Sequence, residues 1–327
     1  MKILGAPYPF LDLEVYSLRL TIADVRLLLS APLPFEFPPF TREYKTFCDA
    51  SLDWPNPDLC VQLVMGIPDS SQWGKLLTVA APWRLFRAGD VRRLVWDGNN
   101  PQDPLWLAEF VPDSRTVVVY CGARLTIEAD GAKLIRNPLH YPLDQLIMLY
   151  TLTRLGKGIV HSAGLVLGGR CIVAAGRSGA GKSTLSRCWA ARHGIGTLLS
   201  DDRVILGCSL EEGAGTEAYG SPWPGEMGVA LNEHKPLGAL VFLSKAKENR
   251  LVPISSREAV ERLFPVTSIP WFDPEYMVTS LANVERWVAG IPVYEFQFTP
   301  DEKAVKTLET LFPFSGGTVS GGATRPT

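Results

Sequence analysis

CIVAAGRSGAGKST, residues 171–184, is the stretch of sequence that decides the expected fold. Its second part fits the pattern GxxxxGK[ST], in which glycines let successive backbone N–H groups converge on phosphate oxygens. Lys182 can supply a positive charge to the β- and γ-phosphates, and Ser183 can ligate Mg²⁺. The residues expected to hold the phosphates of a nucleotide are Gly176, Arg177, Ser178, Gly179, Ala180, Gly181, Lys182, Ser183 and Thr184.

The residues on both sides of this loop support the same interpretation. The apolar run 171–175 predicts a strand. Residues 182–193 predict a helix, with Leu185 and Trp189 on one face and Gly194 as the stop. A strand, a glycine-rich loop and a helix in that order place the helix N-terminus behind bound phosphates. We therefore expect a nucleoside triphosphate or a related phosphate as ligand.

A second strand is predicted at HSAGLVL, residues 161–167, and Gly168-Gly169 joins it to the predicted strand at 171–175. A two-residue link joins antiparallel strands, whereas parallel strands need a much longer crossover. The loop is therefore predicted to follow an antiparallel hairpin. In common GTPases and small-molecule kinases, by contrast, the phosphate-binding loop begins a parallel βαβ unit.

Acidic residues follow the predicted helix at a position that suits phosphoryl transfer. Residues 195–200 predict a strand that ends at Asp201 and Asp202. Of two carboxylates near a phosphate loop, one can hold Mg²⁺ and the other can accept a proton from a hydroxyl nucleophile. His161 and Glu226 are further candidates, and their alternatives are an ordinary strand histidine and an exposed loop glutamate.

These stretches resemble the catalytic domain of the HPr kinase/phosphorylase family. The pattern of that family is a histidine at the start of a strand, a short hairpin, a GDSGxGKS loop, a helix and a strand ending in ADDRV. The matching stretches here are His161, Gly168-Gly169, GRSGAGKS at 176–183 and SDDRV at 200–204. The resemblance extends over roughly residues 143–310 and implies a mixed-sheet P-loop kinase core related to phosphoenolpyruvate carboxykinase, α+β or α/β in class.

The resemblance also implies a reaction and a role for each site residue. The reaction is ATP- and Mg²⁺-dependent transfer of the γ-phosphoryl group to a serine-type hydroxyl of a protein, peptide or small molecule. Asp201 would be the base for that hydroxyl, and His161 would neighbour the site of transfer. The implied catalytic residues are Asp201, His161 and Lys182. The implied metal ligands are Ser183, Asp202 and Glu226.

Several features depart from the family pattern and keep alternatives open. Thr184 stands where HPr kinases usually have glutamate, and the second family signature, LEIRGLGIINV, is not found. The segments NPLHYPLDQL, SPWPGE and IPVYEFQFTPD are more similar to the free-standing HPr-kinase-like proteins of bacteria. The alternatives are a nucleotide-binding regulatory protein without transfer activity, and phosphorolysis as in the bifunctional relatives. Family members commonly form hexamers, so a homo-oligomer is a further expectation.

The sequence before this region predicts a separate β-rich domain. Residues 59–65, 77–81 and 116–121 are strand-like, and five of the nine tryptophans (54, 73, 83, 96 and 106) can anchor a core. We expect an antiparallel accessory or substrate-recognition domain at 1–136. The breaker NPLHYP and a helix from Leu143 then open the catalytic domain at 137–314, and a flexible tail follows at 315–327.

Composition excludes several classes of protein. The chain has 327 residues, 32 lysines and arginines against 34 aspartates and glutamates, and a formal charge of -2. This balance disfavours nucleic acid or an anionic membrane as partner. The first residues do not form a signal peptide, no apolar run is long enough for a membrane span, and the six cysteines are scattered. A cytoplasmic location is expected.

Overall fold

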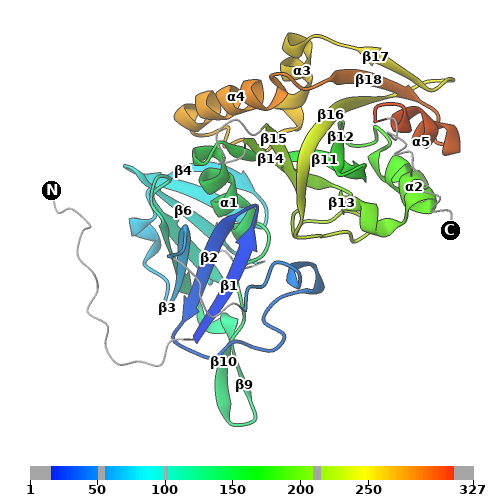
Figure 1. Cartoon of the computed structure of the whole chain (residues 1–327). Helices are drawn as coiled ribbons and strands as arrows, with labels where there is room; N and C mark the ends of the chain where they lie inside the picture. Colours follow the sequence, from blue (N-terminus) through cyan, green and yellow to red (C-terminus); the bar gives the residue numbers. More distant parts are fainter. Residues whose placement is uncertain (1–15, 51–55, 99, 101, 209–214, 313–327) are drawn as a thin grey trace, which may run out of the picture.

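The computed structural model describes residues 16–50, 56–98, 100, 102–208 and 215–312. Within these ranges the protein is a mixed α+β structure with two large mixed sheets and a β-rich N-terminal region. Figure 1 shows the first sheet in blue and cyan and the second in green to red. We call residues 16–135 the first lobe and residues 157–312 the second lobe. The predicted tail and Trp54 lie outside the described residues.

The first lobe is built on one sheet, whose described strands have the spatial order β1-β2-β3-β8-β7-β6-β5-β4. These strands are β1 (Tyr16–Ile22), β2 (Val25–Ala31), β3 (Leu59–Met65), β4 (Lys75–Ala80), β5 (Trp83–Ala88), β6 (Val91–Trp96), β7 (Trp106–Phe110) and β8 (Thr116–Cys121), and a separate hairpin is formed by β9 (Thr126–Ala129) and β10 (Ala132–Ile135). The strands predicted at 59–65 and 116–121 are confirmed. The expectation of a purely antiparallel sheet is wrong, because β3 runs parallel to both β2 and β8.

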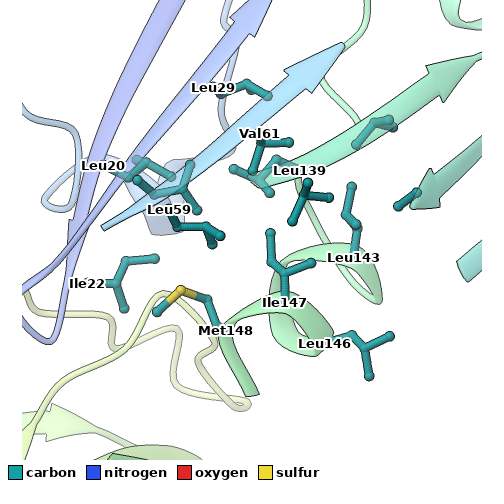
Figure 2. Packing of buried hydrophobic residues seen from close by; sticks show 14 of the residues in the cluster. Leu20, Ile22, Leu29, Leu59, Val61, Leu139, Leu143, Leu146, Ile147 and Met148 are labelled. Carbon is teal, nitrogen blue, oxygen red and sulfur yellow. The ribbon is translucent and has the colours of Figure 1, made fainter. Parts of the chain in front are cut away.

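Helix α1 (Leu143–Arg154) covers one face of the first sheet (Figure 2). Its predicted apolar residues Leu143, Leu146, Ile147 and Tyr150 belong to one buried cluster with side chains of β1, β2 and β3. The helix is buried on its other sides as well, because it also contacts β11 and α4 of the second lobe. Each fully buried leucine-sized side chain contributes about 1.5–3 kcal/mol to folding. Helix α1 is therefore a core element that the two lobes share.

The second lobe is built on one sheet, in which two long strands each change neighbours along their length. Its strands are β11 (Lys157–Leu167), β12 (Arg170–Ala175), β13 (Leu198–Ser200), β14 (Arg203–Cys208), β15 (Thr216–Tyr219), β16 (His234–Lys245), β17 (Arg250–Pro253) and β18 (Val293–Phe298). Strand β11 pairs with β14 through its first half and with β12 through its second half. Strand β16 pairs first with β15 and then with β12 and β18. The predicted Gly168-Gly169 hairpin is confirmed by the antiparallel register of β11 and β12.

Helices cover both faces of this second sheet. They are α2 (Lys182–His193), α3 (Ser256–Leu263), α4 (Pro274–Val288) and α5 (Glu302–Glu309). Trp189 of α2 shares a buried cluster with Val305 of α5, and Leu263 of α3 shares another with Trp287 of α4. The predicted helix 182–193 is thus confirmed and packed. In the part of the chain that the structure describes, no helix is long and apolar enough to span a membrane.

A buried polar cluster around Asp144 of α1 ties the lobes together. Tyr44 of the first lobe donates a hydrogen bond from its hydroxyl to Asp144 Oδ2, and Trp223 of the second lobe donates its Nε1–H to the same oxygen at 2.6 Å. Among the described residues, Asp144 Oδ1 has no hydrogen-bond partner. Burial raises the pKa of the Asp144 carboxyl above its usual range, against the opposing effect of these two donors. The folded state therefore favours the protonated form of this group.

We predict that Asp144→Asn gains stability relative to the wild type as pH rises. A carboxyl whose pKa is raised by folding binds more protons in the folded than in the unfolded state, so its contribution to stability falls as pH increases above its unfolded pKa. Asparagine keeps an oxygen acceptor for Tyr44 and Trp223 but does not ionise. Denaturant unfolding at about pH 4.5 and pH 7.5 measures the difference. Asp144→Leu, which leaves both donors unpaired, should be destabilised at both values, and a pH-independent gap between Asp144→Asn and wild type would contradict the prediction.

Candidate functional site

The glycine-rich loop at 176–181 connects β12 to α2 and is folded tightly. Gly181 is the N-cap of α2 with φ of 109°, a conformation that L-residues rarely adopt. A Cβ on Gly181 would lie 2.6 Å from the ring of Phe298 on β18. The backbone N–H of Ala180 donates to Arg177 O at 3.1 Å and closes the turn. The loop thus needs glycine at position 181 for two independent reasons.

Because the sequence predicts that this loop holds the phosphates of ATP, we predict that Gly181→Ala weakens ATP binding at least tenfold. A left-handed alanine costs about 1–2 kcal/mol, and the clash with Phe298 displaces the backbone that would hold the phosphates. Isothermal titration with ATP and Mg²⁺ measures the effect. Gly168→Ala is the matched control, because Gly168 has φ of 57° but open space around its Cβ position. It should lower stability without changing ATP affinity, and equal affinity losses in both variants would contradict the prediction.

Lys182 lies buried at the first position of α2, folded back over the loop. Its Nζ donates hydrogen bonds to Gly176 O at 2.9 Å and to Arg177 O at 3.3 Å. Burial lowers the pKa of the Lys182 ammonium, and the nearby carboxylate of Asp202 opposes this shift. The lysine is therefore held at the mouth of the loop, within electrostatic reach of Asp202.

Asp202 and His161 form a hydrogen-bonded pair beside the loop. Asp202 follows β13, and His161 lies on β11 directly opposite Arg203 of β14. His161 Nε2 lies 2.9 Å from Asp202 Oδ1, and Arg203 Nη1 donates to Asp202 Oδ2 at 2.5 Å. The hydrogen bond from His161, together with the charge of Arg203, lowers the pKa of the Asp202 carboxyl. Asp202 is thus an ionised acceptor that orients the His161 ring.

Asp201, the expected base, has a different environment. It is only 1% exposed, and its carboxylate accepts backbone N–H bonds from Gly225 at 2.9 Å, Met227 at 2.7 Å and Val229 at 3.3 Å. These bonds use both oxygens to fix the 225–229 loop. This geometry favours a structural role for Asp201, whereas Asp202 contacts the two side chains His161 and Arg203.

The residues expected to hold a metal are not brought together as one cluster. Glu226 is 72% exposed and its carboxylate lies 3.6 Å from Arg187 Nη2, on the outer side of α2. Ser183 and Thr184 are half-buried in the first turn of α2. Within the described ranges, no group of three or more histidine, cysteine, aspartate or glutamate side chains is placed to share a metal ion.

A pocket of about 430 Å³ lies at the loop and at His161 of this pair. It is lined by His161, Arg177, Ser178, Arg203 and residues 265–268. Ser268 N–H donates to Ile159 O at 2.8 Å, which fixes the 265–268 segment against β11. The 265–268 segment is not among the residues that the sequence pattern predicts for the site. Its only signal is the turn-rich run FPVTSIPWFDP at 264–274, about sixty residues beyond the aspartates.

The chain was compared with known proteins. No family model matches it. No curated protein shows significant sequence similarity to it.

Proposed function

We propose that the protein is an ATP- and Mg²⁺-dependent kinase that transfers the γ-phosphoryl group to a hydroxyl-bearing acceptor. The observation that carries this proposal is that His161, which is paired with Asp202, lines one pocket together with Arg177 and Ser178 of the glycine-rich loop. A glycine-rich loop at a helix N-terminus is suited to phosphates, because several backbone N–H groups and the helix dipole act on the same anion. The resemblance to the HPr kinase/phosphorylase pattern supports the same reaction.

In the proposed mechanism the acceptor hydroxyl lies in the pocket beside His161. The ring donates its Nε2–H to Asp202, so the neutral imidazole carries its lone pair on Nδ1 and can accept the hydroxyl proton. The acceptor oxygen bonds to the γ-phosphorus, and the bond from that phosphorus to the β–γ bridging oxygen breaks, so that ADP leaves. Lys182 exchanges its bonds to the loop carbonyls for bonds to the β- and γ-phosphate oxygens.

The oxygen donors beside the loop fit a Mg²⁺ ion that is held mostly by phosphates and water. Such sites use only one or two protein ligands. Ser183 and Asp202 supply a hydroxyl and a carboxylate, and each Asp202 oxygen keeps a further lone pair besides the one used by its hydrogen bond. When bound, the ion neutralises charge on the transferring phosphates. Glu226 is omitted from this set because it is exposed and paired with Arg187.

A second candidate function is a nucleotide-binding regulatory protein without transfer activity. The absence of the second family signature favours it, as does the replacement of glutamate by Thr184 after the GKS sequence. In that case the loop would bind ATP, but no acceptor would be phosphorylated. Transfer activity therefore separates the two candidates, and ATP binding alone does not.

The test combines ATP binding with transfer from γ-labelled ATP to components of a cell extract. We predict that the wild type binds ATP with Mg²⁺ and labels an acceptor, and that Lys182→Ala loses labelling because the γ-phosphate has lost its cation. Lys303→Ala, at an exposed position of α5, is the control and should behave as wild type. ATP binding without labelling of any component would favour the regulatory protein, and absence of ATP binding would reject both candidates.

A further inference from the structure

A second, apolar pocket adjoins the candidate site at the junction of the lobes. It has a volume of about 140 Å³ and is lined by Trp83 and Leu94 of the first lobe, Leu146 and Leu149 of α1, and Ile159 of β11, among others. A dry apolar cavity of ~150 Å³ holds one benzene ring. The pocket therefore has the size of a single aromatic ring or a branched alkyl group.

The two pockets share one lining residue, and residues of the same strand line both of them. Ser268 lines both of them. His161 lines the first and Ile159 lines the second, and both lie on β11. Side chains two residues apart on a strand share one face and are separated by about 7 Å. About 7 Å corresponds to roughly five single bonds of ~1.5 Å along an extended chain. A compound with a hydroxyl beside His161 and a ring whose atoms lie about three to six bonds from that oxygen can therefore reach the apolar pocket.

The first pocket is basic. Its lining includes Arg177, Arg203 and His161 and contains no acidic side chain. Arg177 is exposed, and no side-chain hydrogen bond or ion pair to another described residue is found for it. Arg203 uses Nη1 for Asp202 and keeps its other N–H donors. A planar guanidinium with unused donors is suited to a carboxylate or a phosphate.

We propose that the phosphoryl acceptor is a small amphipathic hydroxy acid, with a hydroxyl, a nearby anionic group and a ring-sized apolar substituent. The anionic group would contact Arg177 and Arg203, and the apolar substituent would enter the pocket formed by Trp83 and Leu94. The first lobe would thus select the acceptor through direct contact with it. This inference rests on the proposed kinase function and names its substrate class. The first pocket, at about 430 Å³, has the size of a small-molecule site, and the second adds space for one ring. These dimensions favour a small molecule over a folded protein.

The test measures equilibrium binding to the whole protein saturated with a non-hydrolysable ATP analogue and Mg²⁺. The probes are 3-phenyllactate, which has all three groups, lactate, which lacks the ring, and 3-phenyl-1,2-propanediol, which lacks the charge. We expect 3-phenyllactate to bind at least about tenfold more tightly than either truncated probe. Equal or weaker binding of 3-phenyllactate, including no detectable binding, would overturn the proposal. Because no transfer is measured, this result is independent of the labelling experiment that tests the kinase function.

Two variants locate the contacts. Arg177→Gln should abolish the preference for 3-phenyllactate over the diol, and Trp83→Leu should reduce its preference over lactate. The affinity of the ATP analogue is measured in both variants. If Arg177→Gln weakens only the analogue, the arginine serves the nucleotide and the proposal fails. Labelling confined to the protein fraction of an extract would also overturn it, in favour of a protein acceptor.

Discussion

Replacing Asp202 by asparagine is expected to lower the rate of phosphoryl transfer by about 10²- to 10⁴-fold, the usual contribution of a positioned proton-transfer group. Arg203 has only donors, so the asparagine carbonyl would face Arg203 and the NH₂ group would face His161. His161 Nε2 must then accept a hydrogen bond, which places the ring proton on Nδ1 and removes the lone pair needed for the acceptor hydroxyl. Single-turnover measurement with saturating ATP and Mg²⁺ reports this loss. Because Asp202 is also proposed to bind Mg²⁺, ATP affinity is measured with and without Mg²⁺, and only the affinity without Mg²⁺ should change little.

Asp201→Asn is the informative comparison because Asp201 is the adjacent carboxylate. Three backbone N–H groups donate to the two oxygens of Asp201. In asparagine an NH₂ group replaces one of these oxygens, so at least one backbone N–H faces another donor. An unpaired buried donor costs about 1–3 kcal/mol. We expect a lower melting temperature and a smaller loss of transfer per folded molecule than in Asp202→Asn. A larger loss of transfer at an unchanged melting temperature would assign the base to Asp201, as the family resemblance implies.

The local architecture around the glycine-rich loop could be predicted from the sequence because its signals are short-range. The hairpin followed from Gly168-Gly169, and helix α2 followed from the spacing of Leu185 and Trp189 before Gly194. Each of these features is determined by residues that are near one another in the chain. The predicted strand at 195–200 was only half right, since residues 195–197 form a 3-10 turn before β13.

The division of roles between the two aspartates could not be predicted, because it depends on partners far away in the sequence. Asp201 is bound by a loop that begins twenty-four residues later, and Asp202 by a histidine forty-one residues earlier. Of the two adjacent carboxylates, one turns inward and is buried against the 225–229 loop. The sequence pattern does not specify which one does. The apolar pocket was missed for the same reason, since Trp83 and Ser268 meet only in the folded protein.

Removing the Asp273 carboxylate is expected to destabilise the protein by about 3–5 kcal/mol, the usual cost of breaking a buried ion pair from one side. Asp273 precedes α4 and accepts bonds from Arg92 of the first lobe, from Nε at 3.0 Å and from Nη2 at 2.5 Å, and from the Tyr150 hydroxyl of α1. The side chains of Arg92 and Asp273 are only 6% and 4% exposed. Asp273→Ala would leave the Arg92 charge buried without its partner. Denaturant unfolding measures the loss.

The exposed pair Arg257–Glu261 provides the control, because its side chains are 89% and 62% exposed. Glu261→Ala should change stability by no more than about 0.5 kcal/mol. The double variant Arg92→Met, Asp273→Leu should recover part of the loss, because it removes both charges. A loss below about 1 kcal/mol in Asp273→Ala would show that Arg92 remains solvated and that the lobes are not joined here. Asp273 follows Ser268 by five residues, and Ser268 lines both pockets. Asp273→Ala should therefore also lower the affinity for a ligand that occupies the two pockets.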